Sequence, residues 1–334
     1  MNIPCPLKIA EQMQLAEIYE VLSPQTSDSE DDDISAYDDS FKRGDVINSG
    51  TAEKVTRVDR ASPGFVTGLV GDQGTCKTIR GVMGRASAYE WAGIIPGDLH
   101  TKGYLCEACF KEQGPGGFHY ICNKVMKRPK LITDAFKKKK FETGNQDRIK
   151  EAVQDCAKSY GMAAVIEFLH SDFYPGPRDR AANLRKTGNH NDVLYDAFVR
   201  WVERCCERNV AFKYYARMFL YYGPLLELFE ISTSHVLGQA REVCYILQLP
   251  TYAHLNFKNY FTETFAHVIN FLGKWPLAFR KLLQKNCAVN LSGKKEGAIE
   301  LDAFVEAEIV QPLKAYVSGK RKGIPPGSVL PTQD

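Results

Sequence analysis

Two aspartates each lie just past a short apolar segment, and these positions are the best candidates for chemistry in the sequence. Asp72 follows Phe65–Val70 (FVTGLV), and Asp98 follows Ala92–Pro96 (AGIIP), with His100 two residues later. Sites in open α/β sheets form outside the carboxyl ends of strands, so neighbouring strands would bring both carboxylates and the imidazole to one edge. Grouped carboxylates would bind Mg²⁺ or Mn²⁺, which would then bind phosphate oxygens. The open alternative is that both aspartates are ordinary turn and cap residues.

The residues from Gly71 onward are also spaced like a Walker phosphate-binding loop, G-x-x-x-x-G-K-[ST]. Cys76 stands where that loop has its second glycine, and Lys77 and Thr78 follow it. A β-carbon at that position hinders the close approach of the backbone to phosphate. No second acidic strand of the Walker B type follows, so a nucleotide-binding loop is not expected.

A small α/β element must position the two aspartates. Phe65–Val70 and Ala92–Pro96 read as buried strands, and Thr78–Trp91 between them has helical spacing. Strand, helix and strand in this order predict a βαβ unit with a parallel sheet. Further along the chain, apolar residues at three- and four-residue steps predict long helices over Arg148–His170, Asp192–Tyr222, His235–Leu247, Asn256–Asn286 and Leu301–Ser318.

The chain therefore divides into an acidic leader (1–60), an α/β core (61–147), a helical domain (148–320) and a tail (321–334). The leader holds 13 acidic and 6 basic residues and few large apolar groups in its Ser-rich part, so it is expected to be largely disordered. Within it, Ile9–Leu22 has apolar residues near helical spacing and is expected to form a short helix. The remaining chain is basic, which suits a polyanionic partner such as DNA or other nucleic acid. No membrane-spanning segment or signal peptide is visible, so an intracellular and possible nuclear location is expected.

The stretch GDQGTCKTIRG and the later IIPGDLH resemble the paired GDQ-x-T and PGD-x-H signatures of an uncharacterised domain-of-unknown-function family found in transposon-rich genomes. Asn259–His267 and Asn270–Tyr316 resemble the closing region of that family. The order of motifs is also similar to RNase H-like transposases of the hAT and Mutator-like type. That resemblance implies a small RNase H-like parallel-sheet core followed by a large helical region. Asp72, Asp98 and Glu263 would then be the metal-binding acids, with His100 and His267 beside them.

The sequence departs from that pattern at the first acid. RNase H-like transposases carry an aspartate on an upstream strand, and Asp59 next to the thin segment Val55–Val58 is the nearest candidate here. Two-metal phosphoryl transfer needs the complete set of carboxylates. We therefore expect a transposon-derived remnant that binds nucleic acid or protein partners, with catalysis doubtful. The alternative is a non-catalytic helical scaffold without a metal site.

Four further residues have a spacing that could bind Zn²⁺. They are Cys106, Cys109, His119 and Cys122, and the glycine-rich segment 114–117 separates the two halves of the set. Thiolates and imidazole suit a tetrahedral zinc site. However, Cys106 and Cys109 are three residues apart, which also fits the buried stripe of a helix.

A cluster of basic residues could contact a phosphate backbone or serve as a nuclear-import signal. It consists of Arg128, Lys130, Lys137, Lys138, Lys139 and Lys140. A solvated helix end is the alternative. The aromatic residues of Asp192–Tyr222 could stack on bases, although their spacing better fits a packed helix with a basic outer face.

Overall fold

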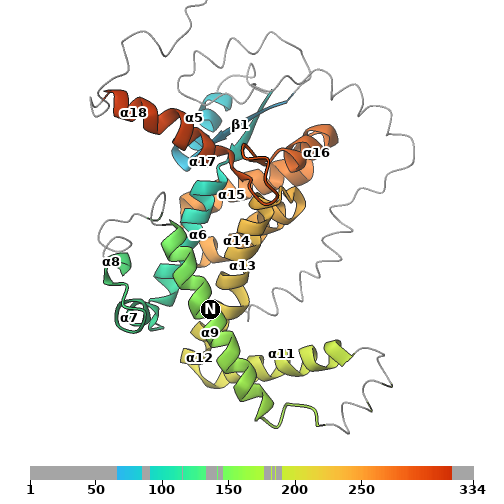
Figure 1. The fold of residues 1–334 in the computed structure, drawn as a ribbon. Coiled ribbons are helices and arrows are strands. Elements are labelled where there is room, and N and C mark those ends of the chain that lie inside the picture. Colours follow the sequence, from blue (N-terminus) through green and yellow to red (C-terminus); the bar gives the residue numbers. More distant parts are fainter. Residues whose placement is uncertain are drawn as a thin grey trace, which may run out of the picture. The chain divides into compact units, whose positions relative to one another are not determined.

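The computed structural model describes residues 66–84, 91–114, 116–132, 141, 146–176, 182, 185 and 190–317. The leader, Asp59, the four lysines 137–140 and the tail 321–334 lie outside the described residues. The described chain is mostly helical and contains a small two-stranded parallel sheet (Figure 1). This confirms the prediction of a small parallel sheet together with a large helical region. Among the described helices, none has the length and apolar character needed to cross a membrane.

The parallel sheet has the strands that the apolar runs predict. Strand β1 (Thr67–Gly71) pairs with β2 (Ala92–Pro96), in a register that runs from Thr67 opposite Ala92 to Gly71 opposite Pro96. All five residues of β2 are buried, as a strand without polar residues requires. Helix α5 (Gln73–Met83) connects the strands and begins five residues earlier than predicted. The early start has a local cause, because Asp72 caps the helix.

The chain forms two compact units, each assembled from separate segments. The sheet unit comprises the described parts of Arg43–Thr101, Ile231–Gln239 and Glu263–Asp334. The helical unit comprises those of Lys102–Glu230 and Ala240–Thr262. These units differ from the predicted division between residues 147 and 148, because each collects residues from both sides of that boundary.

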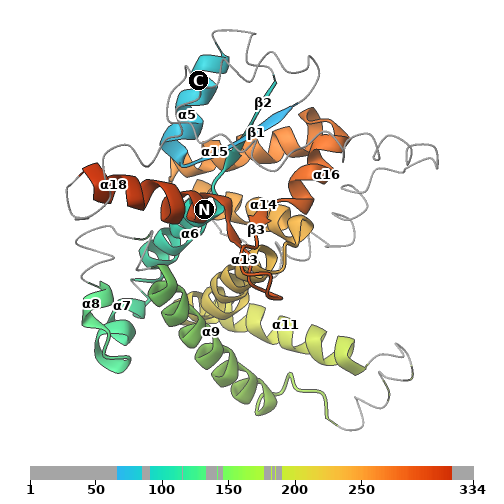
Figure 2. The same cartoon turned by 45° about the horizontal axis from the view of Figure 1, so that its top comes forward.

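An apolar cluster formed by Ile95, Phe271, Phe279 and Leu283 holds the sheet unit together. It joins β2 to helix α16 (Leu277–Lys285) and to the π-helical turn η5 (Asn270–Lys274), which follows α15 (Lys258–Ile269). A β-carbon on Gly93 would lie 2.7 Å from the Phe279 ring, so glycine lets α16 approach the strand. Figure 2 shows β1 and β2 side by side between α5 and α16.

The last part of the sheet unit is a short hairpin followed by a helical segment. Strands β3 (Ala288–Val289) and β4 (Ile299–Glu300) pair antiparallel. The chain then forms α17 (Leu301–Val305), the π-helical turn η6 (Glu306–Val310) and α18 (Gln311–Val317). The helix predicted over Leu301–Ser318 is thus observed up to Val317, with a π-turn inside it.

The helical unit packs around aromatic residues. Phe168 packs edge-on against Phe198, and Trp201 packs against both Phe168 and Phe212. This agrees with the packed-helix interpretation of the aromatic segment. The single helix predicted over Asp192–Tyr222 is broken at Asn209, whose side chain accepts hydrogen bonds from the amides of Ala211 (2.9 Å) and Phe212 (3.3 Å).

The described elements that lie wholly or partly in this unit are α6 (Asp98–Gln113), α7 (Phe118–Tyr120), η2 (Ile121–Val125), α8 (Pro129–Ile132), α9 (Gln146–Leu169), α11 (His190–Arg208), α12 (Val210–Arg217), η4 (Met218–Tyr222), α13 (Gly223–Ser234), α14 (Gly238–His254) and α15.

A buried ion pair links three elements of the helical unit. Arg217 Nε lies 2.6 Å from Glu112 Oε1, and both side chains are almost fully buried. The Tyr222 hydroxyl donates a short hydrogen bond to the same carboxylate. Burial raises the pKa of Tyr222 well above its usual value, and the Glu112 charge raises it further. The phenol therefore remains a hydrogen-bond donor to Glu112 at every physiological pH.

Candidate functional site at the carboxyl edge of the parallel strands

A pocket of about 170 Å³ opens where β1 ends. It has room for several water molecules, each of which occupies about 30 Å³ in liquid water. The described residues that line the pocket include three carboxylates and one imidazole, and no Lys or Arg. Its lining consists of Val70, Gly71, Asp72, Thr75, His100, Leu301, Asp302, Val305, Glu306 and Val310. The structure thus brings Asp72 and His100 together at one edge, as their positions after neighbouring strands predict.

Asp72 has one carboxylate oxygen engaged in a local hydrogen bond. Its Oδ1 accepts from the Thr75 amide at 2.7 Å, which makes it the N-cap of α5. A β-carbon on Gly71 would lie 2.6 Å from Thr75 Cγ2, so the turn from β1 into this cap needs glycine. The cap interpretation of Asp72 is therefore correct, and the second carboxylate oxygen can still bind a ligand.

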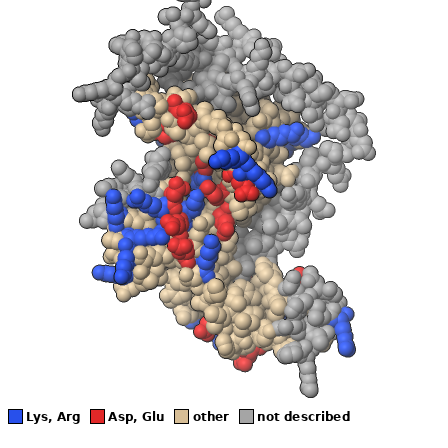
Figure 3. Space-filling model, viewed as in Figure 1, with Lys and Arg blue, Asp and Glu red and all other residues tan. Residues whose placement is uncertain are grey.

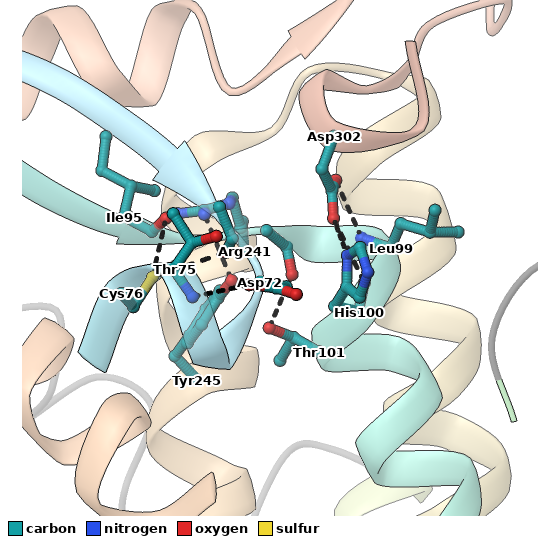
Figure 4. Close-up of polar contacts among 12 residues, drawn as sticks. Asp72, Thr75, Cys76, Ile95, Leu99, His100, Thr101, Arg241, Tyr245 and Asp302 are labelled. Carbon is teal, nitrogen blue, oxygen red and sulfur yellow. Dashed lines mark hydrogen bonds and ion pairs between the residues drawn. The ribbon is translucent and has the colours of Figure 1, made fainter. Parts of the chain in front are cut away.

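Asp302 orients His100 (Figure 4). Its carboxylate accepts hydrogen bonds from the amides of Leu99 (3.1 Å) and His100 (3.2 Å), the first amides of α6. It also lies 2.9 Å from His100 Nδ1. A neutral His100 with its proton on Nδ1 would donate to Asp302, and Nε2 would then carry the lone pair.

Gly97 allows Asp302 to approach α6 this closely. A β-carbon on Gly97 would lie only 2.2 Å from Asp302 Oδ2. Glycine is thus required in the GDQ and PGD signatures for two different steric reasons. Gly71 accommodates the Thr75 side chain, and Gly97 accommodates a carboxylate about two hundred residues later in the chain.

Glu306 is the third carboxylate of the pocket. Its Oε1 accepts hydrogen bonds from Gln311 Nε2 at 2.7 Å and from Lys314 Nζ at 3.1 Å. The Glu306 side chain is 23% exposed and that of Lys314 is 65% exposed, so this ion pair is weak and readily exchanged. Its Oε2 can therefore bind a cation from the pocket.

Glu263, predicted as the last acid of the set, is not among the lining residues of the pocket. Arg80 holds it in a two-pronged ion pair, with 2.7 Å for both Nη1–Oε1 and Nη2–Oε2. His267, one turn later, is buried and packs edge-on against Trp275 at 5.5 Å between ring centroids. The late acids at the pocket are instead Asp302 and Glu306. They lie four residues apart within a predicted helix, as Glu263 and His267 do, so spacing in the sequence does not single them out.

Asp98 is also placed away from the pocket lining. It is the first residue of α6 and is only 4% exposed. A carboxylate at the first turn of a helix is stabilised by the helix dipole. The structure therefore assigns it a place at the helix N-terminus, and Asp302 contacts the next two amides.

Cys76 lies directly behind the pocket loop. Its thiol is fully buried and lies 3.4 Å from the Gly71 carbonyl oxygen and 3.8 Å from that of Ile95. Burial raises the pKa of Cys76 to about 12, and the charge of Glu263 contributes in the same direction. The residue at this position of the Walker-like spacing therefore packs against the sheet as a neutral thiol.

The proposed zinc ligands are placed as core residues. Cys106, Cys109 and Cys122 are fully buried, and burial raises the pKa of Cys106 and of Cys122 to about 12. His119 Nε2 lies 3.1 Å from the Phe110 carbonyl oxygen. Within the described ranges, no group of three or more His, Cys, Asp or Glu side chains has an arrangement that could hold a metal ion. The helical-stripe alternative fits these positions.

Part of the basic cluster is described. Arg128 pairs with Glu151 at 3.2 Å and Asp155 at 3.4 Å on α9, whereas Lys124, Lys127 and Lys130 are exposed. Figure 3 shows blue side chains over this region beside red ones. Of the predicted residues, Arg128 is thus engaged with acids and Lys130 remains available to a polyanion. Two lysines outside the predicted cluster, Lys124 and Lys127, are exposed beside it.

No family model, curated protein or solved structure matches this chain.

Proposed function

We propose that this protein is a transposon-derived, RNase H-like nucleic-acid-binding protein whose pocket binds one Mg²⁺ or Mn²⁺ ion. The observation that carries the proposal is that Asp72, His100, Asp302 and Glu306 line one pocket whose described lining residues include no Lys or Arg. Three carboxylates in one cavity attract a cation and repel a free anion. A bound divalent cation would neutralise phosphate oxygens of a nucleic-acid backbone.

The available oxygens suit a hydrated hard cation. Mg²⁺ usually keeps several waters and takes only one or two protein carboxylates. Asp72 and Glu306 each have one carboxylate oxygen left after their local hydrogen bonds. Among the described residues, no three of these side chains are close enough together to hold a metal ion by themselves. The ion would therefore be bound by one or two carboxylates and keep water in its remaining positions.

Asp302 and His100 would have a supporting role at this site. Asp302 is 8% exposed and accepts three hydrogen bonds from Leu99 and His100. It therefore fixes the ring of His100 at the wall of the pocket. A histidine held through Nδ1 by a carboxylate is a common partner in binding sites, because its orientation and tautomer are set in advance.

The exposed lysines Lys124, Lys127 and Lys130 would add sequence-independent contacts to the phosphate backbone. Binding, and not turnover, is the proposed activity. Asp59, the candidate for the first aspartate of the RNase H-like pattern, lies outside the described residues, and phosphoryl transfer needs the full set of acids.

The test compares Mn²⁺ binding by the full chain with that of Asp72→Asn and Asp72→Ala, using electron paramagnetic resonance of free Mn²⁺. Asparagine is as good an N-cap as aspartate, whereas alanine lowers stability by about 1 kcal/mol. We expect both variants to lose the ion and only Asp72→Ala to unfold at a lower temperature. Unchanged binding in Asp72→Asn would refute the site.

A second candidate is a helical scaffold without a metal site. It is favoured by the structural roles of the acids, since Asp72 and Asp302 cap helices and Glu263 pairs with Arg80. Absence of Mn²⁺ binding in the wild-type chain would select this candidate.

A further inference from the structure

The C-terminal half of α9 exposes a continuous apolar stripe. Met162, Val165, Ile166 and Leu169 have exposed fractions of 68%, 46%, 50% and 48%. Their spacing places them on one side of the helix. The other side of the same turns carries Ala164 and Phe168, which belong to the core of the helical unit. We define the four exposed residues as the α9 stripe.

The stripe has few charges to make it compatible with water. Glu167 is the charged residue within Met162–Leu169, and Phe173 beyond the helix end is a further large apolar residue, 39% exposed. In Figure 3 the lower part of the molecule, where this half of α9 lies in Figure 1, is mostly uncharged. An exposed apolar patch of this kind is a candidate interaction surface.

We propose that the leader segment Ile9–Leu22 packs against the α9 stripe. This segment lies outside the described residues, and its sequence places Leu15, Ile18, Tyr19 and Leu22 at steps of three, one and three residues. Met162, Val165, Ile166 and Leu169 follow the same steps. Two helical faces with the same period and length can interdigitate over the same two turns.

The size of the stripe favours a segment of the same chain over a second copy. Partners in stable complexes each bury about 800 Å², whereas two turns of one helix face expose a few hundred Å² at most. A covalently linked segment acts at an effective concentration on the order of millimolar, so a small contact is enough. The 43 residues between Leu22 and Val66 reach about 140 Å when extended.

Photo-crosslinking tests this packing in the full-length chain. The crosslinker benzoyl-phenylalanine replaces Ile166 and, in a second protein, Met162; circular dichroism checks that each variant is folded. Mass spectrometry then locates the products after irradiation. We expect products with residues 9–22 of the same chain, at a yield that dilution does not change.

Matched leader variants give the control. The double substitution Leu15→Ser and Ile18→Ser is expected to lower the yield about tenfold for each side chain. Glu17→Ser, on the opposite side of the predicted helix, should leave the yield unchanged. Products with a second copy that decrease on dilution, products with another part of the chain, or no products would each overturn the proposal.

Discussion

We predict that, in the Arg80–Glu263 ion pair, removing the arginine lowers the free energy of unfolding more than removing the charge of the glutamate. The Glu263 side chain is 7% exposed and that of Arg80 is 33% exposed. Arg80→Met removes both hydrogen bonds and leaves a buried carboxylate without its counter-charge. Breaking a buried pair in this way costs about 3–5 kcal/mol of the free energy of unfolding. Glu263→Gln leaves a guanidinium that water can reach and keeps one amide oxygen as an acceptor. The loss should be about 1–2 kcal/mol, the scale of a charge-assisted bond replaced by a neutral one.

Urea unfolding of the two variants measures the difference, and Mn²⁺ titration of the same samples tests the role of Glu263. Arg80→Met should be destabilised by about 2 kcal/mol more than Glu263→Gln. Both folded variants should bind Mn²⁺ as the wild type does, because Glu263 is not among the lining residues of the pocket. Equal destabilisation would show that the burial argument fails. Loss of Mn²⁺ binding in Glu263→Gln would restore Glu263 as a ligand.

Three further predictions concern a glycine, a histidine and the exposed lysines. Gly97→Ala should lower the free energy of unfolding by about 1–3 kcal/mol in urea titrations, because its β-carbon would lie 2.2 Å from Asp302 Oδ2; an unchanged midpoint would contradict the close approach. Burial lowers the pKa of His119 below its usual 6.5, against the opposing hydrogen bond to Phe110. The unfolded chain therefore takes up the proton first, and stability present above pH 6.5 is lost as the pH falls. His119→Gln should remove that part of the pH dependence, measured as urea midpoints between about pH 7.5 and pH 5.5, and a slope identical to wild type would be the contrary result. Substitution of Lys124, Lys127 and Lys130 by Gln should reduce the salt dependence of DNA binding, measured by fluorescence anisotropy, by about 0.9 in the logarithmic slope for each lysine that pairs with a phosphate. An unchanged slope would exclude these lysines from the DNA interface.

The parallel strands and the meeting of Asp72 with His100 are predictable from the sequence because their causes are local. Two apolar runs separated by one helix have few ways to pair, and the residue after each strand must lie at the carboxyl edge. The start of α5 is less predictable, because apolar spacing indicates where a helix buries a face and not where its cap lies. The interpretation of Asp72 as a helix cap predicts that α5 begins at Gln73, and the structure has this start.

The late acids cannot be chosen correctly from spacing alone. Glu263 and His267 share a helix face, as do Asp302 and Glu306, and both segments read as helices. Which face meets the pocket depends on packing across about two hundred residues, through Gly97 and the amides of α6. The Cys and His set has the same ambiguity, since a helix stripe and a ligand pair can have the same spacing.

The most direct measurement is Mn²⁺ binding by Glu306→Gln compared with Glu308→Gln. Glu306 lines the pocket, while Glu308 is an exposed acid two residues later that does not. Both variants lose one negative charge from the same turn, so a general electrostatic effect would act on both. We expect one ion per wild-type chain, affinity weaker by about tenfold or more in Glu306→Gln, and wild-type affinity in Glu308→Gln. No ion in the wild-type chain, or equal weakening in the two variants, would contradict this expectation.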